Sequence, residues 1–270
     1  LLASFLIAFL VRYNDFSIKN IFFICLVSIL AALLIQIHFF FKYRSFNKSV
    51  GLPIEKTVQK SFIGFFKERY INLFFLFVLL SGIVSLFIYY FFLMSIDNRF
   101  QDSVSLTYFL GLLIGTMMLF TLILRFIFNY NFLIRKDLKS GLVIIPVIIF
   151  ILVLSSVFIY HFNRTDLVFS GFSLFTLNLI SIWFFSRSLK DTFELPSYKI
   201  IYHPISNSFR QKLQLHVDGT INELAVLISG LILLGFLSLK DFSLAYYFYF
   251  LVVIVLIWFI LEFFYFESIL

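Results

Sequence analysis

Few side chains of this 270-residue chain are of types that do chemistry, and the most informative lie within or beside long apolar runs. Asp218 and Asn222 precede the apolar stretch Leu224–Leu239, whose length as a helix is only about 24 Å. A membrane-spanning helix needs about 20 residues, so this helix must draw in the preceding segment. Asp218 and Asn222 are four residues apart and share one helical face. They are predicted to line an inner vestibule or gate; the alternative is an ordinary helix N-terminus, where acidic side chains suit the helix dipole.

Arg125 is the only basic residue well inside an apolar run. It shares a helical stripe with Gly111 and Gly115, whose spacing allows another helix to approach closely. One interpretation is that Arg125 points into a helical bundle and meets an anionic substrate. The other is that it extends to the headgroups at the inner membrane surface.

Asn178 lies near the middle of another apolar run, and Ser81 and Ser85 form a weaker polar stripe in a third. Three serines share with Asn178 an arc of about 140° around the helix: Ser170, Ser173 and Ser181. Such an arc either lines a cavity or joins helices through hydrogen bonds. Both interpretations stay open at this point.

Motifs of the common enzyme classes are absent from the sequence. It has no glycine-rich phosphate loop followed by Lys-Ser/Thr, no His-Glu-x-x-His motif and no paired-cysteine metal site. The single cysteine, Cys25, excludes a disulfide framework. The sequence therefore predicts no enzyme, cofactor or metal centre.

The composition explains why polar residues within apolar runs matter. Apolar residues make up 62% of the chain and charged residues 13%, with a mean hydropathy of +1.05. A soluble domain carries about 25% charged residues, so a water-soluble protein is excluded, and so is a disordered chain. Eight apolar segments are predicted to be membrane spans, the first of them partial: Leu1–Val11, Ile21–Phe41, Leu73–Ile96, Tyr108–Phe128, Leu142–Phe162, Leu167–Phe185, a run ending at Leu239, and Phe242–Phe266. The predicted fold class is an all-α polytopic membrane helical bundle.

The connections between these spans alternate in basic charge. Segments 42–71, 129–141 and 186–217 hold 15 of the 21 basic residues. The positive-inside rule places these three loops and the C-terminus in the cytoplasm. This distribution accounts for the net charge of +7, so no nucleic-acid partner is predicted.

The long basic segment divides the chain into three predicted parts. Residues 1–41 form the last two spans of a truncated N-terminal half, because the sequence starts at Leu1 within an apolar run. Residues 42–71 form a cytoplasmic linker, in which an amphipathic helix after Pro53 lies on the membrane or contacts a soluble partner. Residues 72–270 form a six-helix transmembrane half, and this pattern is typical of the second half of a twelve-helix transporter.

One stretch carries a family resemblance. Its motifs, in order, are Arg187-Ser188-Leu189-Lys190, Phe193-Glu194, Tyr202-His203-Pro204-Ile205, Arg210-x-Lys212 and His216-Val217-Asp218-Gly219. Together they resemble the signature of the ATP/ADP translocase (nucleotide transporter) family. Lys190 resembles the basic residue before that family's Phe-Asp turn, and Asp218 the acid that opens its eleventh helix.

The resemblance implies a major-facilitator-like fold of twelve helices that exchanges nucleotides across a membrane. This chain would supply the end of helix five, helix six, the linker and helices seven to twelve. The expected function is a secondary transporter that binds an anionic substrate such as ATP or ADP between two halves by alternating access. Basic side chains suit such a substrate, since Arg and Lys bind phosphate. The candidate substrate-binding residues are Arg125, Asn178, Arg187, Lys190, Lys212, Asp218 and Asn222.

Two other functions remain open. One is a carrier for a different organic anion, and the other is a related, non-transporting membrane subunit that anchors or senses in a larger assembly. A transporter predicts an open, positively lined cleft between helices seven, eight, ten and eleven. The non-transporting subunit predicts that the basic residues are paired and that phenylalanine fills the cavity. The expected partners are the lipid bilayer, the missing N-terminal half or an associated membrane subunit, and the expected location is a bacterial inner membrane.

Overall fold

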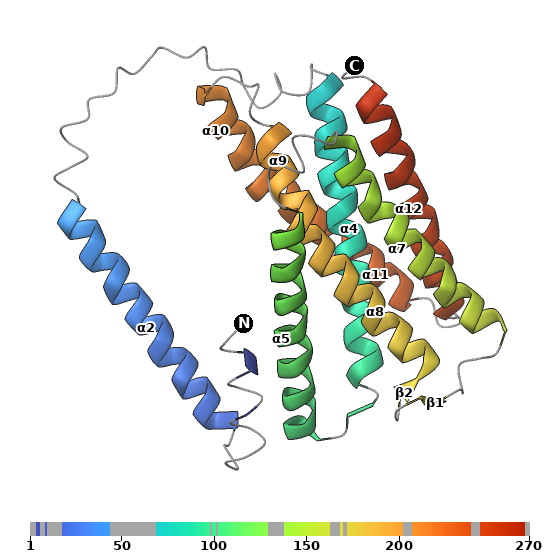
Figure 1. The fold of residues 1–270 in the computed structure, drawn as a ribbon, viewed down its shortest axis with the longest axis horizontal. Coiled ribbons are helices and arrows are strands. Elements are labelled where there is room, and N and C mark those ends of the chain that lie inside the picture. The colour runs from blue at the N-terminus through green and yellow to red at the C-terminus, as the bar shows by residue number, and fades with distance from the viewer. Residues whose placement is uncertain are drawn as a thin grey trace. The chain divides into compact units, whose positions relative to one another are not determined.

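The structure is a computed structural model that describes residues 4–5, 9, 18–43, 69–97, 99–100, 102–128, 138–162, 168–169, 172–201, 207–238 and 244–267. The described residues form an all-α bundle, as predicted (Figure 1). Its elements are α2 (Ile18–Tyr43), α4 (Arg69–Asp97), α5 (Ser103–Ile127), α7 (Leu138–His161), α8 (Leu174–Leu189), η3 (Lys190–Glu194), α9 (Leu195–Ile201), α10 (Asn207–Leu215), η4 (His216–Ile221), α11 (Asn222–Ser238) and α12 (Leu244–Glu267). The segments η3 and η4 are π-helical, and strands β1 (Val168–Phe169) and β2 (Phe172–Ser173) pair antiparallel.

Four described helical segments are long and apolar enough to cross a membrane. They are Ile71–Asp97, Ser103–Ile127, Leu142–His161 and Leu213–Ser238. Shorter apolar segments lie within α2 and α12, at Leu26–His38 and Tyr246–Leu261. These lengths are those expected of a membrane-embedded protein. The last of the four begins before Asp218, so the prediction that this span draws in its preceding residues is confirmed.

The chain divides into two compact units, residues 1–59 with 100–116 and residues 60–99 with 117–270. In the first unit, the described side chains of α2 between residues 26 and 38 are all exposed. The start of α5 in this unit is capped by Asp102, whose carboxylate accepts hydrogen bonds from the backbone N–H groups of Ser105 and Val104. These hydrogen bonds, that of Ser105 foremost, hold the pKa of Asp102 below its ordinary value.

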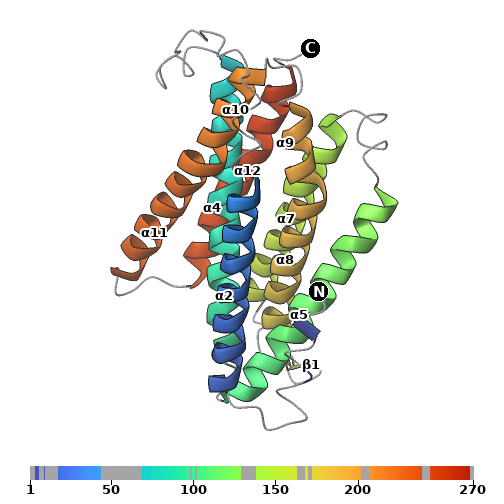
Figure 2. The ribbon, with the colours of Figure 1, turned by 90° about the vertical axis from the view of Figure 1, so that its left-hand side faces the viewer.

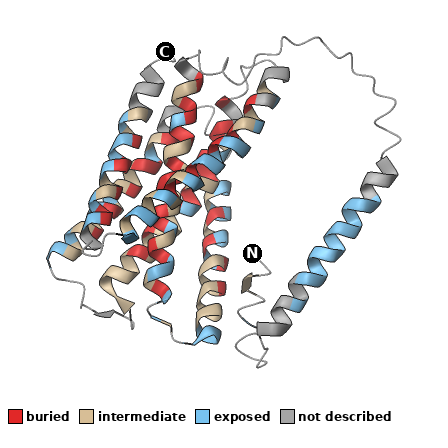
Figure 3. Ribbon diagram, turned by 180° about the vertical axis from the view of Figure 1, so that it is seen from behind, coloured by how far each residue is buried: buried red, intermediate tan, exposed pale blue. Residues whose placement is uncertain are grey.

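The second unit has α4 at its centre. This helix packs against α8, α11 and α12, while α7 packs against α8 and α12, as Figures 1 and 2 show. Buried residues of α7 recur every three or four positions and so form one stripe: Leu142, Ile145, Ile149 and Val153. In Figure 3 the buried residues gather where these helices face one another. Phenylalanine supplies much of this core, including Phe74, Phe87 and Phe248.

Two predictions about segment boundaries are wrong. The predicted span Leu167–Phe185 starts with the hairpin, and its helix begins only at Leu174, because the Ser173 hydroxyl caps it by accepting from the Thr176 N–H at 3.1 Å. The predicted loop 186–217 is helical over residues 186–201 and 207–217. The charges of this segment predict a loop, whereas in the helix Arg187 pairs with Asp191 and Lys190 with Glu194.

Other predictions fall mostly on residues outside the described ones. These are the amphipathic helix after Pro53 and the partial span Leu1–Val11, of which only residues 4, 5 and 9 are described. Most of the predicted loops 42–71 and 129–141 lies there as well.

A close approach of α4 and α11 depends on Gly82. A Cβ atom placed at Gly82 would lie 2.8 Å from the Cβ of Ala225, which is closer than packed side chains allow. Ala225 is itself buried. The two helices therefore contact each other where one residue has no side chain and the other has a single methyl group.

We predict that Gly82→Ala lowers stability by about 1–3 kcal/mol, the usual cost of overpacking. Gly230→Ala in α11 is the matched control, because nothing lies within 4 Å of its added Cβ, and it should be neutral or slightly stabilising. Adding Ala225→Gly to Gly82→Ala should restore most of the loss. Thermal unfolding in detergent measures all three, and an unchanged midpoint for Gly82→Ala would contradict the close approach.

Candidate functional site

The candidate site is built on one continuous helical segment of the second unit. Helix α8 runs without interruption into η3 and then into α9, so residues 174–201 form one continuous helical segment. The π-helical turn between them bonds i to i+5 and re-aims the side chains that it carries; such turns are frequent at functional sites. Lys190 and Glu194 are the first and last residues of this turn.

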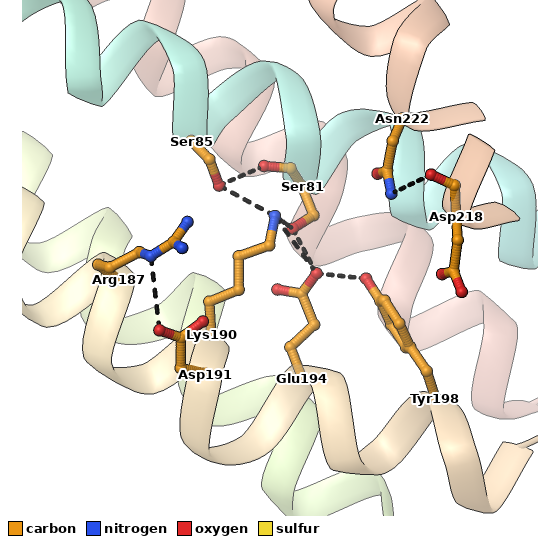
Figure 4. A network of polar contacts seen from close by, with 9 residues as sticks. All are labelled: Ser81, Ser85, Arg187, Lys190, Asp191, Glu194, Tyr198, Asp218 and Asn222. Atoms are coloured by element: carbon orange, nitrogen blue, oxygen red, sulfur yellow. Dashed lines mark hydrogen bonds and ion pairs between the residues drawn. The ribbon is translucent and has the colours of Figure 1, made fainter. Parts of the chain in front are cut away.

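An ion pair between a buried glutamate and a half-buried lysine occupies the π-helical turn. The Lys190 Nζ lies 3.7 Å from Oε1 of Glu194, a residue that is only 1% exposed. The same oxygen accepts hydrogen bonds from the hydroxyls of Ser81, at 2.6 Å, and Tyr198 (Figure 4). Three donors therefore converge on one carboxylate oxygen, while Oε2 is buried and has no hydrogen-bond partner among the described residues.

Helix α4 supplies the acceptors for the lysine. The Lys190 ammonium donates to the hydroxyls of Ser81 at 3.1 Å and Ser85 at 3.2 Å. Ser85 in turn donates to the Ser81 carbonyl at 2.7 Å. Ser81 is the thirteenth residue of the 29 in α4, so the ion pair lies against the middle of a membrane-length apolar helix. Ionisable groups at such positions are costly and mark functional sites by default.

A polar cleft lies beside this pair. It has a volume of about 460 Å³ and is lined by Arg125, Asp191, Leu195, Pro196, Tyr198, Gln214 and Asp218. The end of α5, η3, α9, α10 and η4 each contribute to it. Tyr198 belongs to both features, because it lines the cleft and its hydroxyl donates to Glu194.

The charges around the cleft are partly compensated. Arg125 donates to the backbone carbonyl of Asp191 at 2.8 Å. The Asp191 carboxylate lies 3.4 Å from Nε of Arg187, whose side chain is 58% exposed. Asp218 is an exposed acid on η4. The lining thus combines one arginine with two carboxylates, and the positive lining expected of a transporter is not observed.

The structure brings four of the predicted site residues to this region: Arg125, Arg187, Lys190 and Asp218. Arg125 is exposed and points to Asp191 rather than away from the bundle. Asn222 follows Asp218 by one helical turn, and its amide donates to the Asp218 carbonyl at 3.4 Å. Lys212 lies in α10, and its side chain is outside the described ones.

Asn178 connects two helices and is not among the residues that line the cleft. Its amide donates to the Ser156 hydroxyl at 2.7 Å and to the Leu152 carbonyl at 3.3 Å, and its oxygen accepts from Ser155 at 3.0 Å. All three partners belong to α7. Asn178 therefore joins α7 to α8, which agrees with the second interpretation of its polar arc. Of the other members of that arc, Ser173 caps the helix and Ser181 bonds to its own helix, while Ser170 lies outside the described residues.

Tyr198 is a functional candidate that the sequence analysis did not single out, and Glu194 enters it only as part of the Phe193-Glu194 motif. A usable signal exists, since Lys190, Glu194 and Tyr198 follow one another at spacings of four, which places them along one helical face. That signal requires the segment to be helical, whereas its charges led to the prediction of a loop. The stripe of Ser81 and Ser85 was noted, but nothing in the sequence indicated its partner.

Fold and site together define a helical bundle with membrane-length apolar helices and a buried ion pair beside a polar cleft. Comparison with protein-family models, with curated proteins and with solved structures finds no match to this chain. The function is therefore argued from the site itself.

We predict that Lys190→Met destabilises the protein by about 3–5 kcal/mol, because it leaves the Glu194 carboxylate buried without its cation. Arg187→Met, which removes the exposed partner of Asp191, should cost less than about 1 kcal/mol. The double variant Lys190→Met/Glu194→Gln should recover most of the loss, since the amide oxygen still accepts from Ser81 and Tyr198. Thermal unfolding in detergent is the measurement, and equal losses for the two single variants would contradict a stabilising pair.

Proposed function

We propose that this chain is part of a secondary transporter in which Lys190 binds an anionic substrate that enters through the cleft. The observation that carries the proposal is the Lys190–Glu194 pair, held against the middle of α4 at a π-helical turn. A pair of charges in such a place costs several kcal/mol of desolvation for each ion, and a purely structural helix contact does not require it.

The cleft is the proposed entry for the anion, although neither Lys190 nor Glu194 itself lines it. Its volume of about 460 Å³ lies within the range of small-molecule sites. Tyr198 lines the cleft and donates to Glu194, and Arg125 at the cleft is a second cation that can bind an anion. The resemblance to nucleotide translocases, which includes Lys190, makes ATP and ADP the first substrates to test. Alternating access would then move this bundle against a second half.

A specific observation favours the second candidate function, a non-transporting membrane subunit. The basic side chains Arg187 and Lys190 both have carboxylate partners, and aromatic rings fill the spaces between helices. Phe92 stacks on Trp183 with ring centroids 4.2 Å apart, and Phe128 contacts Phe193. In such a subunit the ion pair would only fix the helices in place.

Binding of labelled ATP to the purified full-length protein distinguishes the two candidates. A transporter should bind ATP saturably, and Lys190→Ala or Arg125→Ala should weaken binding at least about tenfold, since hydrogen bonds to charged groups contribute about 1.5–3 kcal/mol. Arg99→Ala is the matched control: this arginine lies beyond the end of α4, over the ring of Phe172, and its loss should leave affinity unchanged. Absence of saturable binding by the wild type would favour the non-transporting subunit.

A further inference from the structure

The two oxygens of Glu194 have very different surroundings. Oε1 receives the Lys190 ammonium and the hydroxyls of Ser81 and Tyr198, whereas Oε2 is buried without a hydrogen-bond partner among the described residues. A proton can therefore be added at Oε2 while Oε1 keeps both hydroxyl donors. The lysine likewise keeps its bonds to the hydroxyls of Ser81 and Ser85 whether or not the carboxylate is charged.

Charge balance restricts which charge states Lys190 and Glu194 can adopt together. Lys190 is half-buried and its one ion-pair partner among the described residues is Glu194, which is fully buried, so a charged Glu194 left without its cation is costly. Residues 71–88 of α4 and 142–159 of α7 contain no titratable side chain. Lys190 and Tyr198 are the titratable groups that face Glu194, and the charges of Arg125, Asp191 and Asp218 lie at the cleft.

An external anion can therefore pair with Lys190 only if Glu194 gives up its own charge. If both the anion and the carboxylate stayed charged, one lysine would face two negative groups at a buried site. Uptake of one proton by Glu194 removes this conflict. Tyr198 lines the cleft and donates to Oε1 of Glu194, so one side chain links the carboxylate to the proposed anion entry.

We propose that Glu194 is a proton-binding site and that it takes up one proton when an anion replaces it as the partner of Lys190. The inference rests on the proposed function, because it assumes that an anion reaches Lys190. It goes beyond that function by naming the proton as a second ligand, whose binding is coupled to binding of the anion. A transporter built on this site would therefore carry the anion and the proton together. The carboxylate and the proton form the neutral acid at Oε2, and no other bond changes.

Calorimetric titration of ATP into the full-length protein tests this coupling, because buffers of different ionisation enthalpy report the number of protons taken up. For the wild type we expect about one proton per bound ATP beyond that of the matched variant, and over the pH range of that uptake an affinity that falls about tenfold per pH unit. Glu194→Gln should bind without this uptake and without this fall in affinity, and more tightly than the wild type at the upper end of the range. Since both proteins receive the same ligand, the titration of ATP itself cancels in the comparison.

Two further variants make the test specific. Asp97→Asn makes the same carboxylate-to-amide change at the exposed last residue of α4, away from the cleft, and it should keep the proton uptake of the wild type. Tyr198→Phe removes a donor to the ionised carboxylate, which favours the neutral acid, so the pH at which affinity falls should rise. If Glu194→Gln does not fold, Tyr198→Phe provides the test. The same pH dependence of ATP affinity in Tyr198→Phe and the wild type would then overturn the proposal.

The possible outcomes separate this inference from the proposed function. ATP binding by the wild type with the same proton count as Glu194→Gln would overturn the inference and leave the anion-binding function in place. Binding by Glu194→Gln alone would support it, because the native carboxylate then outcompetes the anion. If neither protein binds ATP at any pH, both the inference and the proposed nucleotide function are wrong.

Discussion

The ion pair between Lys190 and Glu194 is the interaction on which the rest of the structure depends. Two charges placed against an apolar helix lose their hydration, and their mutual attraction offsets that loss only if further hydrogen bonds complete the site. Ser81 and Ser85 of α4 and Tyr198 of α9 provide those bonds. The position of α8 and η3 beside α4 is thus determined by polar atoms as well as by apolar packing. A shift of either helix would leave a buried charge without its partner.

Helix α4 can contact both the ion pair and α11 because its consecutive residues face different elements. Ser81 faces the ion pair, whereas the next residue, Gly82, faces Ala225 of α11. Consecutive residues of a helix are about 100° apart, so one turn can serve two partners. The approach of α11 also positions η4, which packs against α4 and carries Asp218 to the cleft. The buried pair and the cleft are therefore positioned by the same turn of α4.

Hydropathy predicts most of this fold, because a long apolar segment has few alternatives to a membrane-length helix. It predicts α2, α4, α5, α7 and α12 closely, and the short apolar run after Asp218 correctly indicates that this acid belongs to its helix. Hydropathy wrongly predicts a loop around Lys190 and Glu194, because it treats each charge as if it had no partner. At a spacing of four residues the two charges compensate each other, so a segment that counts as polar packs as part of a bundle. Which serines of another helix complete that pair depends on tertiary packing, and neither hydropathy nor spacing contains this information.

The π-helical turn has no comparable signal in the sequence, yet it affects how the two side chains of the pair are oriented. In an α-helix a residue four positions along is rotated by about 40° from the first, since each residue adds about 100°. A π-helical turn advances fewer degrees per residue, so in η3 the fourth residue falls short of a full turn instead of passing it. In either kind of helix the spacing of four keeps Lys190 and Glu194 near one line, and here both reach the hydroxyl of Ser81. The irregular turn thus sets the side of Lys190 on which the carboxylate lies, and the spacing of four sets their proximity.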